Sequence, residues 1–448
     1  MSELLKRKIG LLQATAINMI DMVGIGPFVT LYMVIRIMNG PWFLYAWLIG
    51  AFLAFMDAMV WSELGAAYPM AGGSYNFLKI AYGEKKWGRL FSFLYVWQTC
   101  IQAPLVMASA AIGFAEYLNY FYPLEVWQSK MVSGAVVILV VVLLYRKIEA
   151  IGRISMIMWI SVFAIFGWII MGALGRGNFL QPILHMNDGL ALNQMFVVLL
   201  GQASVKTIYS YLGYYNVCHL GGEIKNPERN IPRSMFISVG GIFVLYMALN
   251  ISVVSVIPWQ EARTESYVVS NFIREVSGQG ASRVATILVL IVAFSSVFSA
   301  TLGYSRVPYA AAADGAFFKI FSRLHPTKEF PYVSLLFLGS LGFIFSLLFK
   351  MRNVIDAILA MRILVQFVAQ TIGLMLLRRK YGSSKLPFRM WLYPLPAILS
   401  LLIWQFVFVS TGWYAVWGSI VALIGIVVFY VKRNFEKIPA GPSLPADH

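Results

Sequence analysis

Residues 17–30 place groups that can bind a ligand inside an otherwise apolar stretch. They read INMIDMVGIGPFVT, with an acid (Asp21), two glycines (Gly24 and Gly26) and a proline (Pro27) where a membrane helix is normally regular. A break at this point leaves amides without partners at the start of one half-helix and carbonyls without partners at the end of the other. Glycines let a ligand touch that backbone directly. The segment therefore predicts an interrupted helix with a small-molecule site at the interruption.

A second interruption is predicted in residues 209–217, which read YSYLGYYNV and carry Gly213 among aromatic residues. Carbonyls that precede each break can accept an ammonium group, and free amides at Ile25 and Gly26 can hold a carboxylate. A compact zwitterion matches both ends of such a site. The alternative is that the glycines only let helices pack closely, as in contacts between small residues four apart.

The composition is that of a helical membrane protein. Hydrophobic residues make up 60% of the 448 residues and charged residues only 12%, which is about half the charged fraction of a soluble globular chain. Apolar runs of about 20 residues recur along the chain, and each is long enough to cross a bilayer. We predict twelve transmembrane helices, at residues 10–36, 41–66, 90–119, 130–146, 153–174, 192–222, 232–257, 284–312, 332–349, 354–378, 391–410 and 412–431.

The net charge of +16 follows this predicted topology. Most of the 35 lysine and arginine residues fall in alternate loops and in the two tails, which the positive-inside rule assigns to the cytoplasm. We expect a multi-pass protein of a prokaryotic inner or plasma membrane, with both termini cytoplasmic and the lipid bilayer as its surroundings. Because the basic charge reports topology, no nucleic-acid partner is expected.

The two interruptions fall in the first and the sixth predicted helix, five helices apart. Two five-helix inverted repeats, each with a broken first helix, produce this spacing. The predicted organisation is a cytoplasmic tail (1–9), a first repeat (10–174), a second repeat (192–378), two further helices (391–431) and a second cytoplasmic tail (432–448).

Charged side chains within membrane helices are costly and usually functional. Asp21 lies at the first break, where it can bind a substrate ammonium group, carry a coupling proton or pair with a buried base. For Asp57 we expect a structural pair with a buried base. Lys206 and Arg362 are the candidate bases, as neutralising partners of these acids.

Three serines of the eighth predicted helix, Ser295, Ser296 and Ser299, can supply oxygens to a sodium ion. Serines of membrane helices also commonly bond to their own backbone, so both interpretations remain open. Cys100 and Cys218 fall inside predicted spans, and no spacing of cysteine and histidine is typical of a metal site. No cofactor is expected.

Five segments form a combination that extends along nearly the whole chain. They are VGIGPF (23–28), SELGAAYPMAGGSYNFL (62–78), YLGYYNVCHLGGEIKNPERNIPRSM (211–235), GYSRVPYAAAADGAFF (303–318) and RILVQFVAQTIGLMLLRRK (362–380). These segments look like the first, second, sixth, eighth and tenth helices of one family. The chain resembles the amino acid–polyamine–organocation (APC) transporter superfamily, and within it the L-type amino acid transporter-like permeases.

The resemblance implies an all-α fold of twelve transmembrane helices: five plus five in an inverted repeat of the leucine-transporter type, with helices one and six broken, plus two C-terminal helices. It also implies secondary-active amino acid transport by alternating access, with Tyr211 or Tyr214 as an aromatic gate over the site. The residues that it places against the substrate are Val23, Gly24, Ile25, Gly26, Tyr209, Ser210, Tyr211, Leu212, Gly213 and Tyr214.

Two departures from the family pattern concern recognition and coupling. Ile25 stands where the family usually has a serine between the glycines, so backbone recognition is retained and a hydroxyl contact is lost. Many sodium-independent members carry a lysine in the fifth helix, and Val162 aligns near that position here. Lys206 is then a candidate to replace that charge. The coupling ion, H⁺ or Na⁺, stays open.

An enzyme, a channel and a polyamine carrier are the competing interpretations. An enzyme needs a nucleophile that faces a base, and none of the four histidines has a catalytic spacing. A channel needs rings of polar groups, which breaks in two helices do not favour. Among carriers, amino acid transport is favoured. The alternative is uptake of polyamines or cationic amino acids, coupled to protons or by exchange.

Overall fold

The structure is a computed structural model. It is built of helices, and among the described residues its only β-type contact is an isolated parallel bridge between Ile9 and Ile224. Most of the two predicted tails lies outside the described residues. The structure describes residues 7–70, 72–83, 87–145, 151–328, 330–382 and 386–435, except the side chains of residues 151–159 and 435.

Each of the twelve predicted segments overlaps a helix, and short helices fill several connections. The helices are α1 (Leu11–Met22), α2 (Gly26–Met38), α3 (Leu44–Ala67), α4 (Ser74–Ala81), α5 (Gly88–Leu118), α6 (Val126–Leu144), α7 (Ile151–Arg176), α8 (Gln181–Leu184), α9 (Gln194–Tyr211), α10 (Asn216–His219), α11 (Pro227–Val254), α12 (Trp259–Ala262), α13 (Val268–Ser277), α14 (Gln279–Tyr304), α15 (Arg306–Ala313), α16 (Tyr332–Leu348), α17 (Met351–Arg362), α18 (Gln370–Tyr381), α19 (Leu395–Ser410) and α20 (Trp413–Phe435).

The helices support a multi-pass membrane protein. Within the described ranges, seven helices are long and apolar enough to cross a membrane, and eight spans result when the bent pair α1 and α2 counts as one. Three more apolar stretches, Ile160–Arg176 within α7, Tyr332–Leu348 and Leu395–Ser410, are shorter over the part of the chain that the structure describes. The described helices therefore support a multi-pass protein, and the number of twelve spans stays a prediction.

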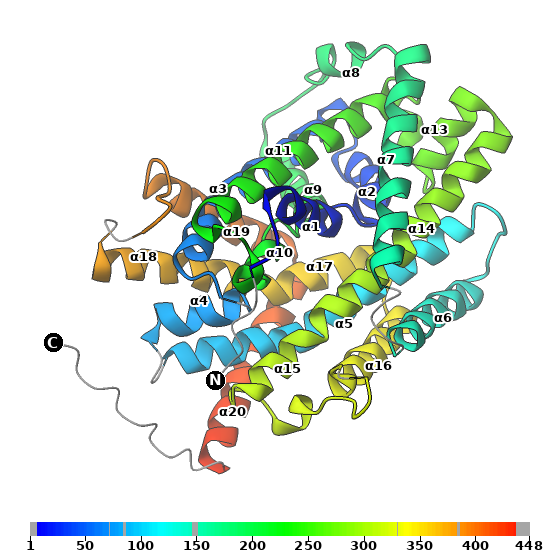
Figure 1. The fold of residues 1–448 in the computed structure, drawn as a ribbon. Coiled ribbons are helices and arrows are strands. Elements are labelled where there is room, and N and C mark those ends of the chain that lie inside the picture. The colour runs from blue at the N-terminus through cyan, green and yellow to red at the C-terminus, as the bar shows by residue number, and fades with distance from the viewer. Residues whose placement is uncertain are drawn as a thin grey trace.

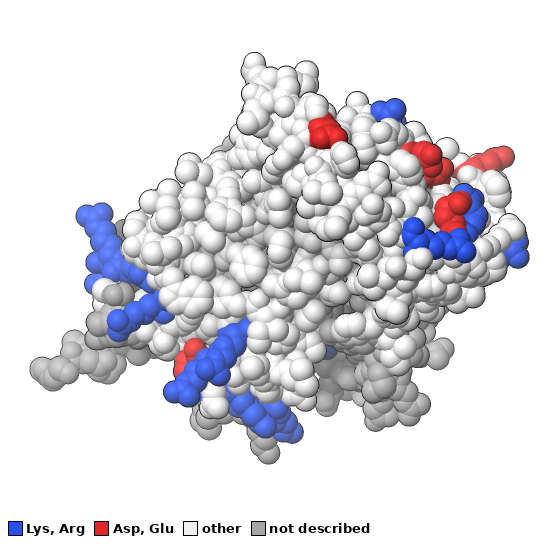
Figure 2. All heavy atoms as spheres, turned by 90° about the horizontal axis from the view of Figure 1, so that it is seen from above, with Lys and Arg blue, Asp and Glu red and all other residues white. Residues whose placement is uncertain are grey.

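The outer surface has the character of a lipid-facing wall. Large apolar side chains of the outer helices are exposed, among them Leu139, Met171, Leu423 and Val427. Soluble monomers rarely expose so much contiguous apolar surface. Figure 2 shows a broad belt without charged residues, with Lys and Arg gathered at one end and a mixed group of acids and bases at the other.

Both predicted interruptions are present, and they lie in the middle of the molecule. The first helix breaks after Met22 and resumes at Gly26 with a bend of 48°. The sixth breaks after Tyr211 and resumes at Asn216. Figure 1 shows α1, α9 and α10 at the centre, surrounded by α3, α11, α14 and α17. The fold therefore buries both breaks among the long helices.

One end of the bundle is fixed by polar contacts between loops and helix ends. Arg378 at the end of α18 binds both carboxylate oxygens of the buried Glu63, each at 2.5 Å. The hydroxyl of Tyr75 donates to Asp314, which also pairs with Lys79 at 3.0 Å. Burial and the Asp314 carboxylate raise the pKa of Tyr75 well above its usual value, so its phenol remains a donor.

Candidate substrate-binding site

The two breaks touch each other through Gly213. This glycine has a φ of +122°, and a Cβ on it would lie 2.8 Å from the carbonyl carbon of Asp21 and from the amide nitrogen of Met22. Only glycine tolerates both this backbone conformation and this close approach. Gly213 therefore lets the two interruptions form one site.

Side-chain oxygens from neighbouring helices hold the broken ends. The hydroxyl of Tyr246, on α11, lies 2.8 Å from the Met22 carbonyl and 3.0 Å from the Ser210 carbonyl. The hydroxyls of Thr30 and Ser210 bond to each other at 2.9 Å. The side chain of Asn18 accepts from the Val217 amide at 2.8 Å. The contacts of Tyr246 and Asn18 satisfy backbone groups that a break would otherwise leave buried and unpaired, and the pair of hydroxyls joins α2 to α9.

The sequence suggested that the amides at the first break are free, and in the structure one of them is bonded. The Ile25 amide donates to the hydroxyl of Ser296 at 3.2 Å. That hydroxyl in turn lies 3.1 Å from the Val292 carbonyl of its own helix. The amides of Gly24 and Gly26 have no acceptor among the described residues. The prediction for Ile25 is thus corrected: a serine hydroxyl from α14 supplies the oxygen next to that amide.

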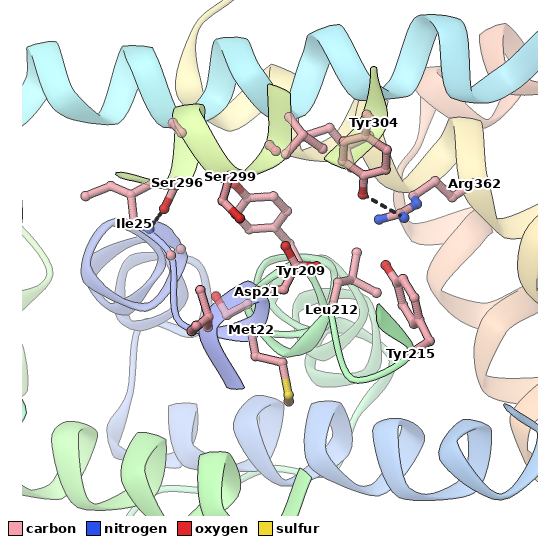
Figure 3. Close-up of a pocket in the computed structure, with 18 residues that line it drawn as sticks. Asp21, Met22, Ile25, Tyr209, Leu212, Tyr215, Ser296, Ser299, Tyr304 and Arg362 are labelled. Atoms are coloured by element: carbon pink, nitrogen blue, oxygen red, sulfur yellow. Dashed lines mark hydrogen bonds between the residues drawn. The ribbon is translucent and has the colours of Figure 1, made fainter. Parts of the chain in front are cut away.

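A cavity of about 70 Å³ opens at the breaks (Figure 3). It has room for a few waters or a compact solute. Ten of the predicted residues line it, and they come from α1, α2, α9, α14 and α17 or from the breaks between them. They are Asp21, Gly24, Ile25, Gly26, Tyr209, Ser210, Leu212, Ser296, Ser299 and Arg362.

The two tyrosines predicted as an aromatic gate do not line the cavity. The hydroxyl of Tyr214 donates to Asp57 at 2.5 Å, and Tyr211 packs its ring against Trp47 and Tyr246. Neither residue lines the cavity. Tyr215 lines it instead, because the turn at Gly213 rotates the following residues, and it was not predicted from the sequence.

The predicted partners of the buried charges are also corrected. Asp57 accepts hydrogen bonds from Tyr214, from Ser400 at 3.3 Å and from Trp404 at 3.2 Å, and no base lies within 4.0 Å of it among the described residues. Lys206 pairs with Asp356 at 2.5 Å. Neither Asp57 nor Lys206 lines the cavity.

Val23, Ser295 and Val162 share a second cavity of about 20 Å³ on the other side of the first break. Val162 aligns near the lysine position of sodium-independent relatives, and the structure brings it next to Ser295, one of the three serines considered for a sodium ion. Of the described residues around this cavity, Ser295 alone carries a polar side chain. Val23 lines this second cavity and not the main one, and its contact with substrate stays a prediction.

Arg362 closes the opposite end of the main cavity. It is the last residue of α17, where a π-helical turn begins at Ile363–Ala369. Its Nη2 donates to the hydroxyl of Tyr304 at 3.1 Å, and its Nε donates to Gln366 at 3.0 Å. Tyr304 also lines the cavity and was not predicted from the sequence. The only signal for it was its place inside the motif at residues 303–318.

A comparison with known families identifies the family of the chain. The sequence model of a family described as "Amino acid permease" matches residues 9–430. The chain belongs to this family. It is a permease of the APC superfamily, as the motifs suggested, and the family is one of transporters and not of enzymes.

The names of curated relatives of this permease give different substrates. The serine/threonine exchanger SteT of Bacillus subtilis is 25% identical over 414 residues, which cover 91% of each chain. The branched-chain amino acid permease BcaP of the same species is 21% identical over 456 residues, or 97% of this permease and 95% of the relative. Cationic amino acid transporter 4 of Mus musculus is 26% identical over 375 residues, or 79% and 57%. Amino acids are therefore the common substrate class.

Proposed function

We propose that this permease is a secondary-active carrier that binds an amino acid at the two breaks and moves it by alternating access. The observation that carries the proposal is the contact between the breaks at Gly213, which gathers backbone polar groups beside a small cavity. The amides of Gly24 and Gly26 face the α-carboxylate. Asp21 and the carbonyl end of α1 face the ammonium group.

The same proposal includes the finer topology. Twelve spans, arranged as two inverted repeats (10–174 and 192–378) and two further helices (391–431), are supported by the position of the breaks five predicted spans apart. Backbone hydrogen bonds join Lys8 and Ile9 to Glu223 and Lys225, which puts the start of the chain and the loop after α10 on one side. That side is the cytoplasmic one by its basic charge, and the membrane is a prokaryotic inner or plasma membrane.

Polyamine or cationic amino acid uptake is the second candidate, because the carboxylate of Asp21 lines the cavity. One relative is also named a cationic amino acid transporter. Arg362 in the same cavity opposes a substrate with an additional positive charge, since the two charges would repel each other in a low dielectric. Amino acid transport with a zwitterionic backbone contact is therefore favoured.

Uptake into proteoliposomes tests the proposal. Purified permease is assayed with a panel of radiolabelled amino acids and with putrescine, with and without gradients of Na⁺ and pH, and with empty or amino-acid-loaded vesicles. We expect uptake of at least one amino acid and no uptake of putrescine. Uptake that requires internal amino acid indicates exchange, and uptake driven by one gradient indicates symport of that ion. Putrescine uptake without amino acid uptake contradicts the proposal.

Asp21 is tested in the same assay. If it binds the ammonium group or carries a coupling proton, Asp21→Asn reduces uptake or removes its dependence on the pH gradient. Unchanged uptake and unchanged pH dependence in Asp21→Asn would remove both roles.

A further inference from the structure

Arg362 is a buried cation whose hydrogen-bond partners are all neutral. The residue is 4% exposed and bonds to the side-chain oxygens of Gln366 and Tyr304. Its guanidinium carbon lies 5.3 Å from the ring centre of Tyr215 and 5.9 Å from that of Tyr304. Among the described residues, no carboxylate lies within 4.0 Å of its nitrogens. A guanidinium has more N–H donors than these two acceptors use.

The other buried bases in the described helices are treated differently. Lys206 pairs with Asp356 at 2.5 Å, and Arg378 binds both carboxylate oxygens of Glu63. A buried charge without a counter-ion is costly, particularly at membrane depth. Lys206 and Arg378 each have an acid within 4.0 Å, whereas Arg362 faces the cavity and interacts with the Asp21 carboxylate over a longer distance.

The polar groups follow an order along the cavity. Figure 3 shows Ile25 and Ser296 at one end, Asp21 and Ser299 between, and Arg362 with Tyr304 at the other end. Asp21 and Arg362 are the one acid and the one base among the described residues that line the cavity. In chemical terms, the free amides of Gly24 and Gly26 next to Ile25 make a carboxylate-binding end, Asp21 an ammonium-binding middle and Arg362 a second carboxylate-binding end.

We propose that the substrate is an acidic amino acid, whose side-chain carboxylate binds Arg362 and the hydroxyl of Tyr304. This inference rests on the proposed function and adds the substrate class to it. A guanidinium binds a carboxylate through two parallel hydrogen bonds, which a neutral amide of the same shape cannot reproduce because one of its two ends is a donor. The ring of Tyr215 packs against the guanidinium and keeps it in position.

The test uses pairs of substrates with the same shape and different charge. Uptake of L-glutamate is compared with that of L-glutamine, and L-aspartate with L-asparagine, in proteoliposomes of the wild type, Arg362→Gln and Arg362→Lys. In the wild type we expect at least about a tenfold preference for the acid, as for other sites built around a buried polar group. Arg362→Gln removes or inverts this preference. Arg362→Lys retains part of it, because it keeps the charge without the planar pair of donors.

Two controls make the outcome specific. Arg379→Gln, at the exposed end of α18, keeps the wild-type preference. Size-exclusion elution shows whether each variant is folded. If Arg362→Gln is not folded, the ratio of acid to amide uptake in the wild type and in Arg362→Lys tests the inference.

Three results overturn the inference. The first is transport of neutral amino acids with rejection of glutamate and aspartate, which leaves amino acid transport intact. The second is an acid preference that Arg362→Gln does not change. The third is an equal loss for all substrates in Arg362→Gln that Asp21→Asn restores in the double variant, which makes Arg362 a counter-ion of Asp21. Absence of uptake for every amino acid would instead refute the proposed function itself.

Discussion

Gly213 touches the backbone of Asp21: a Cβ at position 213 would lie 2.8 Å from the Asp21 carbonyl carbon. The two residues are far apart in sequence, yet their contact brings both interruptions to one place. The site therefore depends on a glycine that carries no chemical group of its own.

Gly213→Ala is expected to abolish uptake and destabilise the protein. The φ of +122° alone costs an alanine about 1–3 kcal/mol, and the clash with Asp21 and Met22 adds to it. Melting temperature in detergent and uptake in vesicles measure the two effects. Gly278→Ala is the matched control, because Gly278 has a φ of +88° and an added methyl group there would meet nothing within 4 Å. Equal effects of the two substitutions would show that φ, and not the contact between the breaks, matters.

Tyr246→Phe tests the hydroxyl that lies between the Met22 and Ser210 carbonyls. Its removal leaves buried carbonyl groups without this donor, so we expect a loss of about 1–3 kcal/mol of stability and slower uptake. Tyr120→Phe is the control, since that hydroxyl bonds to Ser282 at 2.7 Å away from the breaks. A Tyr246→Phe protein with wild-type melting temperature and uptake contradicts this role.

The pair of Lys206 and Asp356 is expected to be structural. Lys206→Met leaves a buried carboxylate unpaired and should cost about 3–5 kcal/mol. The double variant Lys206→Met/Asp356→Leu should lose less than the sum of the single variants. Lys79→Met removes a more exposed pair with Asp314 and should cost about 0–1 kcal/mol. If the losses of stability measured by thermal unfolding add up, Lys206 and Asp356 have no interaction energy and this prediction is contradicted.

Tyr214 and Tyr215 should give opposite results. Tyr215→Ala removes a ring that lines the cavity, so we expect a raised KM for the substrate. Tyr214→Phe removes a hydrogen bond to Asp57 and should lower the melting temperature with little change in KM. A KM that rises only in Tyr214→Phe would restore the gate assignment made from the sequence.

The positions of both breaks could be predicted from the sequence, because Gly24, Gly26, Pro27 and Gly213 act locally on the backbone. The directions of the tyrosines after Gly213 could not. They depend on the φ of that glycine, which pattern alone does not give, and so Tyr215 was missed and Tyr214 was placed in the site.

Partners of buried charges were equally difficult to predict. Lys206 and Asp356 are separated by 150 positions, and several acids of other helices were available. Asp356 itself lies in a predicted span and was overlooked, although an acid at membrane depth is a signal that the sequence carries. Family membership, in contrast, followed from five motifs along the chain and is confirmed by the match over residues 9–430.

The contacts around the breaks group the four half-helices into two pairs, α1 with α10 and α2 with α9. The segment before α1 pairs with the loop after α10 through the bridge of Ile9 and Ile224, and the side chain of Asn18 joins the same two half-helices. The other pair consists of α2 and α9, which are joined by the hydrogen bond between the hydroxyls of Thr30 and Ser210. The two pairs meet at Tyr246, which bonds to the Met22 carbonyl of one pair and to the Ser210 carbonyl of the other. A tilt of one pair relative to the other about Tyr246 would open the cavity while the hydrogen bonds within each pair stay intact.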